Sequence, residues 1–142
     1  LLEESAANYR ERAERSRVNL TVECEDLKIE VNQTLMVQAI SNLIDNALKV
    51  SEPRGLIAVK ARADQSGILT TVSDEGPGIE SEHLPRLFER FYRVDRGRSR
   101  KEGGTGLGLA IVKHVTLAHG GSVSVESTPG KGSTFCIQIP VA

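Results

Sequence analysis

The sequence GGTGLGLA at residues 103–110 places four glycines directly before the start of an apolar helix. Beyond it, apolar residues recur at helical spacing as far as Ala118, and the pair Gly120-Gly121 ends the pattern. Glycines allow the backbone to approach a ligand closely, and the free N–H groups of a helix N-terminus favour an anion such as phosphate. The segment lacks the Gly-Lys-Ser/Thr of a P-loop, and Leu109 takes the last glycine position of a Gly-x-Gly-x-x-Gly motif. It therefore predicts an anion-binding turn, with a flexible hinge before a helix as the alternative.

Composition and charge describe an ordinary globular domain. The chain has 142 residues, 39% of them hydrophobic and 26% charged, which excludes a disordered polypeptide. The net charge of −1 gives no global field toward nucleic acid or a membrane surface. No apolar run approaches the length of a membrane span, and Cys24 and Cys136 form no metal-binding pattern. We expect a cytoplasmic domain with reduced thiols, cut from a larger protein.

The N-terminal 17 residues predict a separate helix. They are charged and contain neither Gly nor Pro. Leu2, Ala6, Tyr9 and Ala13 recur at three- and four-residue steps and form a thin apolar stripe. Such a stripe suits a partner helix, although a solvated terminal helix fits as well.

Strands and helices alternate along the rest of the chain. Asn32 is suited to cap a long helix that continues to about Leu48 and stops before Pro53. Short helical turns are expected within 81–92, and a polar loop over 93–102. Strand-like alternation is found at 20–24, 27–31, 56–63, 68–73, 122–127 and 134–140, the last four forming two hairpins. This mixture predicts an α+β fold, a two-layer sandwich with helices packed on one face of a mixed sheet.

The long helix carries a polar face with an unusual composition. Gln38, Asn42, Asn46 and Lys49 lie at steps of four, four and three, and so share one side of the helix. The apolar residues of the opposite side are Met36, Ala39, Ile40, Leu43 and Ala47. Amide oxygens suit a hard cation such as Mg²⁺ that shares phosphate oxygens, and a lysine one turn on can reach a phosphate. A solvated polar face is the alternative for this helix taken alone.

Asp74 begins the glycine-containing stretch DEGPGI, residues 74–79, at the end of a predicted strand. A carboxylate in this position, beside glycines that add no bulk, can accept a hydrogen bond from a ligand amine such as that of adenine. The competing interpretation is a turn begun by Asp, in which Gly and Pro serve only the backbone angles.

The long helix, the Asp74 loop and the glycine segment together are far more specific for a function than any one of them alone. In chain order the sequence contains NLIDNALK at 42–49, DEGPG at 74–78, FERFYR at 88–93, GTGLG at 104–108 and GKGSTF at 130–135. This series resembles the N, G1, F, G2 and G3 boxes of the catalytic ATP-binding domain of bacterial sensor histidine kinases, in the GHKL superfamily. The resemblance covers residues 18–142 and implies a Bergerat-type ATP-binding fold. Residues 1–17 resemble the C-terminal end of the dimerisation helix that precedes this domain.

The resemblance implies roles for individual residues. Asn46 resembles the Mg²⁺-ligating asparagine, and Asn42 lines the same site. Lys49 is similar to the phosphate-facing lysine, and Arg93 matches the residue that meets the γ-phosphate. Asp74 looks like the adenine-recognising aspartate. The other implied nucleotide contacts are Gly76, Gly78, Ile79, Tyr92, Gly104, Thr105, Gly106, Leu107, Gly108 and Thr134. Val50 departs from the tyrosine that often follows the lysine.

Residues 93–102 correspond to the ATP lid of the family. They contain five cationic and two acidic side chains, a local basic excess in a nearly neutral chain. A nucleic-acid patch is weakly supported, because no aromatic side chain inside the loop is available for base stacking. We interpret the loop as a lid that neutralises triphosphate charge, with the glycine segment as its hinge.

The implied activity is that of an ATP-dependent protein-histidine kinase with Mg²⁺ as cofactor. The phosphate acceptor would be a histidine on the dimerisation domain of a homodimeric parent, anchored in the inner membrane, and a response-regulator aspartate would receive the group. His83, His114 and His119 stand outside the acceptor pattern, so we expect them to be structural or solvated. The alternatives are a GHKL conformational ATPase, disfavoured because Asn42 replaces a glutamate base, and a nucleotide-binding serine-kinase or anti-sigma-type module.

Overall fold

The structure is a computed structural model that describes residues 2–25, 31–65, 67–90, 92 and 107–140. Arg93, Gly104, Thr105 and Gly106, together with the lid prediction for 93–102, lie outside the described residues. The strand expected at 27–31 also lies outside them, except for Val31, which is not in a strand.

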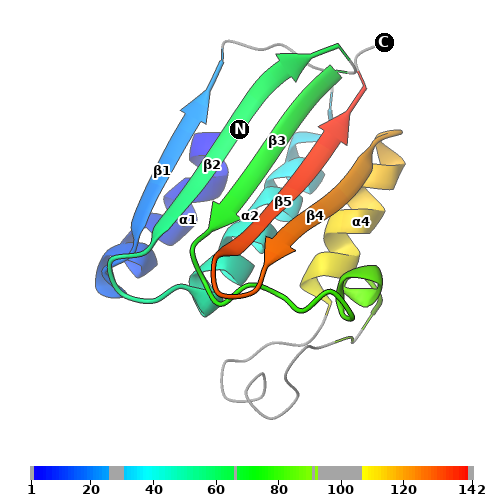
Figure 1. The fold of residues 1–142 in the computed structure, drawn as a ribbon. Helices are drawn as coiled ribbons and strands as arrows, with labels where there is room; N and C mark the ends of the chain where they lie inside the picture. The colour runs from blue at the N-terminus through cyan, green and yellow to red at the C-terminus, as the bar shows by residue number, and fades with distance from the viewer. Residues whose placement is uncertain (1, 26–30, 66, 91, 93–106, 141–142) are drawn as a thin grey trace.

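A five-stranded mixed sheet forms one layer of the molecule, and the helices form the other (Figure 1). The strands are β1 (Asn19–Cys24), β2 (Leu56–Asp64), β3 (Gly67–Asp74), β4 (Ser122–Thr128) and β5 (Gly132–Ile139). Their order is β1-β2-β3-β5-β4. β1 runs parallel to β2, and the other neighbours are antiparallel. The predicted α+β sandwich and both hairpins are confirmed.

The helices α1 (Leu2–Arg15), α2 (Gln33–Val50) and α4 (Gly108–Ala118) cover one face of the sheet, and the short 3-10 helix η1 spans Leu84–Arg86 (Figure 1). Alternate residues of each central strand face the helices, as in Phe135 and Ile137 of β5, which are at most 2% exposed. The predicted apolar side of α2 is buried against them. The core therefore lies between α2 and the middle of the sheet.

The predicted ends of the long helix are confirmed. Asn32 is its N-cap, and its side-chain oxygen accepts a hydrogen bond from the Leu35 N–H at 3.0 Å. His119, which follows α4, also contributes: its Nε2 accepts from the Asn32 backbone N–H at 3.0 Å, and its Nδ1 lies 2.8 Å from the Val115 carbonyl. The ring therefore bridges the end of α4 and the start of α2, accepting through Nε2 and donating through Nδ1. His119 therefore has a structural role, as the sequence predicts.

The N-terminal helix has its partner within the same chain. Leu2, Ala6 and Ala13 of the predicted stripe are buried, and Tyr9 packs partly buried against the same core. α1 contacts α2 and β1. A domain boundary at residue 17 remains a prediction, since α1 shares its apolar core with the rest of the domain.

Candidate nucleotide-binding site

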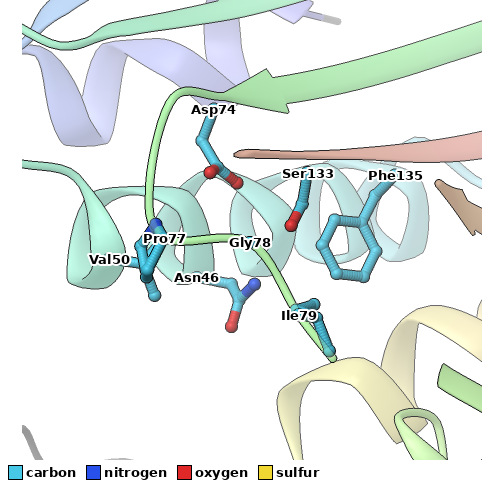
Figure 2. A pocket seen from close by; sticks show the side chains of 8 residues that line it. All are labelled: Asn46, Val50, Asp74, Pro77, Gly78, Ile79, Ser133 and Phe135. Atoms are coloured by element: carbon cyan, nitrogen blue, oxygen red, sulfur yellow. The ribbon is translucent and has the colours of Figure 1, made fainter. Parts of the chain in front are cut away.

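A pocket opens where α2 and β3 end and β5 begins (Figure 2). Asn46 and Val50 come from the last turns of α2, and Asp74 closes β3. The remaining lining residues are Pro77, Gly78, Ile79, Ser133 and Phe135. The pocket thus brings the asparagine face of the long helix next to the aspartate loop, two features separated by 28 positions in the sequence.

Asp74 places a buried carboxylate at this pocket. The residue is 7% exposed, and its Oδ1 accepts a hydrogen bond from the Gly76 N–H at 2.8 Å. Burial raises the pKa of Asp74 above its usual value, against the opposing effect of backbone hydrogen bonds from Gly76 and Ser133. The carboxylate is directed toward the pocket (Figure 2). It is therefore placed to accept a hydrogen bond from a ligand amine.

The two glycines of the loop are required by close packing. A Cβ at Gly76 would lie 2.9 Å from the Val50 carbonyl oxygen. Gly78 has a φ of +76°, and a Cβ there would lie 2.3 Å from the Thr128 carbonyl oxygen. The loop is also tied to the end of β4, where the Ile79 N–H donates to Ser127 Oγ at 2.7 Å, and to the β4–β5 turn, where the Gly130 N–H donates to the Pro77 carbonyl at 2.7 Å. The turn interpretation and the binding interpretation are thus compatible, since the turn builds the pocket wall.

The polar face of α2 is divided among three environments. Asn46 points into the pocket (Figure 2), whereas Gln38 is exposed. Asn42 is directed to the start of α4, where its Nδ2 lies 3.5 Å from the Gly108 carbonyl oxygen. Gly108, the first residue of α4, therefore lies beside Asn42, and Leu107 precedes it as the N-cap.

Three predicted contacts lie away from the pocket wall. Lys49 Nζ is 3.0 Å from Asp45 Oδ2 instead. Tyr92 hydrogen-bonds His83, and its ring lies 4.6 Å below the Arg86 guanidinium. Thr134 Oγ1 is 2.9 Å from Ser73 Oγ.

Strand alternation explains the position of Thr134. Successive side chains of β5 point to opposite faces of the sheet, so Ser133 and Phe135 face the pocket while Thr134 faces away from the helices. Ser133 and Phe135 were missed by sequence reasoning. The alternation of Phe135, Ile137 and Ile139 could have identified them. Ser133 lies two positions before Phe135 and therefore shares the buried face of the strand.

Within the described residues, no group of three or more His, Cys, Asp or Glu side chains is arranged to hold a metal ion. In the same part of the chain, no helix combines the length and apolar character needed to cross a membrane.

The raised pKa of Asp74 predicts a pH-dependent stability effect. The native chain holds this proton more tightly than the unfolded chain, so Asp74 stabilises the fold at low pH and loses that contribution as the pH rises from about 4 through its native pKa. Asp74→Asn cannot titrate. Its free energy of unfolding, relative to wild type, should therefore increase with pH over this window in urea titrations.

Asp45 provides a control of opposite sign. Burial raises its pKa, but hydrogen bonds from Arg12 and Lys49 outweigh burial and hold the pKa below its usual value. Asp45→Asn should therefore lose stability relative to wild type as the pH rises from the native pKa of Asp45 to about 4. The same direction of change in both variants would contradict the assignment of Asp74.

Comparison with known proteins agrees with this geometry. Residues 31–142 match the family described as histidine kinase-, DNA gyrase B-, and HSP90-like ATPase. Sensor-like histidine kinase SenX3 of Mycolicibacterium smegmatis is 40% identical over 141 residues, covering 99% of this chain and 37% of that protein. The chain thus spans about a third of the length of such relatives.

Solved structures show the same similarity. The catalytic domain of histidine kinase ThkA matches with a TM-score of 0.85 at 26% identity, over 99% of this chain and 91% of that one. Full-length ShkA in complex with AMPPNP matches with a TM-score of 0.84 at 28% identity, over 99% of this chain and 29% of that one.

The fold and the family match define the class: the chain belongs to the family of histidine kinase-, DNA gyrase B- and HSP90-like ATPases. Within that family it is an ATP-binding catalytic domain of the sensor histidine kinase type, which confirms the resemblance read from the sequence boxes.

Proposed function

We propose that this domain binds Mg-ATP and donates the γ-phosphate to a histidine on a dimerisation domain outside this chain. The observation that carries the proposal is the pocket itself, in which the buried Asp74 carboxylate and the Asn46 amide line one cavity. Asp74 would accept the adenine amine, and Asn46 would lie toward the phosphates. Support also comes from the similar histidine kinase ShkA, which was solved with AMPPNP.

Asn46 fits a role as ligand to Mg²⁺. Its amide oxygen is a hard donor, and its side chain points into the pocket (Figure 2). When bound, the ion would neutralise charge on the phosphates and align them for transfer. Asn42 lies one turn earlier, and an amide cannot take a proton from water at neutral pH, which favours transfer to a partner over hydrolysis.

Lys49 and Arg93 complete the proposed phosphate contacts. Lysine is a point charge on a flexible four-carbon stem, so Lys49 can reach from its position beside Asp45 toward phosphates next to Asn46. Arg93 is proposed from its place in the sequence box alone. Gly104, Thr105 and Gly106 would supply backbone N–H groups before α4.

The acceptor and the downstream partner belong to the same proposal. His83 and His119 have hydrogen-bond partners within the fold. We therefore assign the acceptor to the dimerisation domain of a homodimeric parent kinase, with a response-regulator aspartate as the next recipient. A cytoplasmic position beside an inner-membrane anchor of the parent is part of this assignment.

Asn46→Ala is the variant that tests the proposal. Calorimetric titration with a non-hydrolysable ATP analogue should show that Mg²⁺ strengthens binding to wild type and has little effect on the variant, because the amide oxygen is lost. Transfer of label from γ-labelled ATP to a supplied dimerisation domain should fall in parallel.

Gln38→Ala is the matched control. It removes an exposed amide from the same helix two turns earlier, and should retain the Mg²⁺ dependence and the transfer rate of wild type. Equal Mg²⁺ dependence in wild type and Asn46→Ala would contradict the metal assignment, and wild type that binds no nucleotide would overturn the proposed function.

A further inference from the structure

Asp45 stands between two cations that come from different helices. Its Oδ1 lies 2.5 Å from Arg12 Nη1 of α1, and its Oδ2 lies 3.0 Å from Lys49 Nζ one turn along α2. The Asp45 side chain is 26% exposed, as is that of Lys49. Arg12 also lies 5.9 Å from the centre of the Tyr9 ring, which packs against the core. The cluster therefore joins α1 to the helix that carries the proposed metal ligand.

Lys49 lies beside the pocket without lining it. Asn46 and Val50, which flank it along the helix, both line the pocket. The ion pair with Asp45 draws the ammonium toward α1. A phosphate next to Asn46 would compete with the Asp45 carboxylate for the same cation.

We propose that Asp45 is a positioning residue that shares Lys49 with the nucleotide phosphates, and that Arg12 of α1 sets the balance between the two positions. This inference rests on the proposed function. If it holds, the packing of α1 against α2 affects the affinity for the nucleotide phosphates, although no residue of α1 lines the pocket that contains Asn46 and Asp74.

The direction of the effect follows from the cost of an unpaired charge. When Lys49 turns to a phosphate, a carboxylate that remains bound to Arg12 keeps one cationic partner. Without Arg12, the same movement would leave a half-buried carboxylate without either cation, and such a group is costly. Arg12 therefore favours the movement of Lys49 to a phosphate, whereas Asp45 favours the position of Lys49 in the ion pair.

The test compares ATP with AMP, because the two share adenosine and differ in the number of phosphates. Arg12→Gln should weaken ATP binding about two- to fivefold, the range of a partly exposed ion pair, and leave AMP binding unchanged. Asp45→Asn should strengthen ATP binding by a similar factor. In the Asp45→Asn background, Arg12→Gln should have no further effect, as a double-mutant cycle requires.

Two controls separate this mechanism from a general loss of charge or of structure. Arg10→Gln removes a cation from the same helix, where Arg10 pairs with Glu3, and should bind ATP as wild type does. Arg12→Lys keeps the charge and should restore the ATP-to-AMP affinity ratio. Thermal unfolding would confirm that each variant is folded.

The outcomes are distinct. Arg12→Gln with an unchanged ATP-to-AMP ratio, in a chain that binds ATP, would overturn the inference and leave the proposed function intact. Additive effects of Arg12→Gln and Asp45→Asn would overturn it as well. A wild-type chain that binds neither nucleotide would overturn the proposed function together with this inference.

Discussion

Asp74→Asn should lower the affinity of the domain for ADP about tenfold to a hundredfold, since hydrogen bonds to charged groups contribute about 1.5–3 kcal/mol. Asp74 is buried at the pocket, where solvent does not weaken the interaction. Its Oδ1 accepts from the Gly76 N–H, and a carboxylate has further lone pairs that can accept from a ligand amine. In the variant, either the amide NH₂ faces the ligand and donates where an acceptor is needed, or the amide oxygen faces it and accepts without a charge. Calorimetric titration with ADP measures the effect.

Glu75→Gln is the matched control for this prediction. It removes the same charge one residue later, but Glu75 Oε1 accepts a hydrogen bond from the Leu56 N–H at 2.7 Å, outside the pocket. We expect its ADP affinity to stay within about twofold of wild type, as for a screened surface charge. Equal affinities for Asp74→Asn and wild type would contradict adenine recognition by Asp74.

Gly78→Ala should destabilise the domain by about 3 kcal/mol or more and weaken nucleotide binding with it. The added methyl group would lie 2.3 Å from the Thr128 carbonyl oxygen and 2.9 Å from the Pro129 Cα, both of which are backbone atoms. Relief requires the loop to move away from the β4–β5 turn, which breaks the hydrogen bond from Ile79 to Ser127. Urea unfolding and ADP titration measure the two effects.

Gly130→Ala isolates the contribution of close packing. Gly130 has a φ of +82°, nearly that of Gly78, but a Cβ there meets no atom within 4 Å. Its substitution should cost only the strain of a positive φ, about 1–2 kcal/mol, and should preserve ADP binding. If both variants lose the same stability, backbone angle alone explains the glycine at 78.

Sequence patterns were sufficient for the local elements of this domain. The apolar spacing around Ile40 and Leu43 predicts α2, and Asn32 marks its start because a short side-chain oxygen satisfies a free N–H there. Alternation predicts the two hairpins. These features depend on backbone sterics and on residues a few positions apart, so they can be predicted directly from the sequence.

The orientation of site residues depends on contacts that a sequence does not state. The sequence box assigns Thr134 to the site, whereas the register of β5 places Ser133 opposite Asp74 and turns it to the pocket. Lys49 is paired with Asp45, and Arg12 reaches the same carboxylate from a helix 33 positions away. Such arrangements depend on strand register and helix packing, which are set by the fold as a whole.

The sequence by itself therefore determined the class of this protein, its main elements and the residue types of its proposed nucleotide site, because periodicity, caps and motif spacing are local properties of the chain. The tertiary structure alone decided which side chains share the pocket and which are held elsewhere. It also decided that the N-terminal stripe packs against α2 of the same chain, since burial of an apolar face requires only a complementary surface and the fold brings that surface within reach.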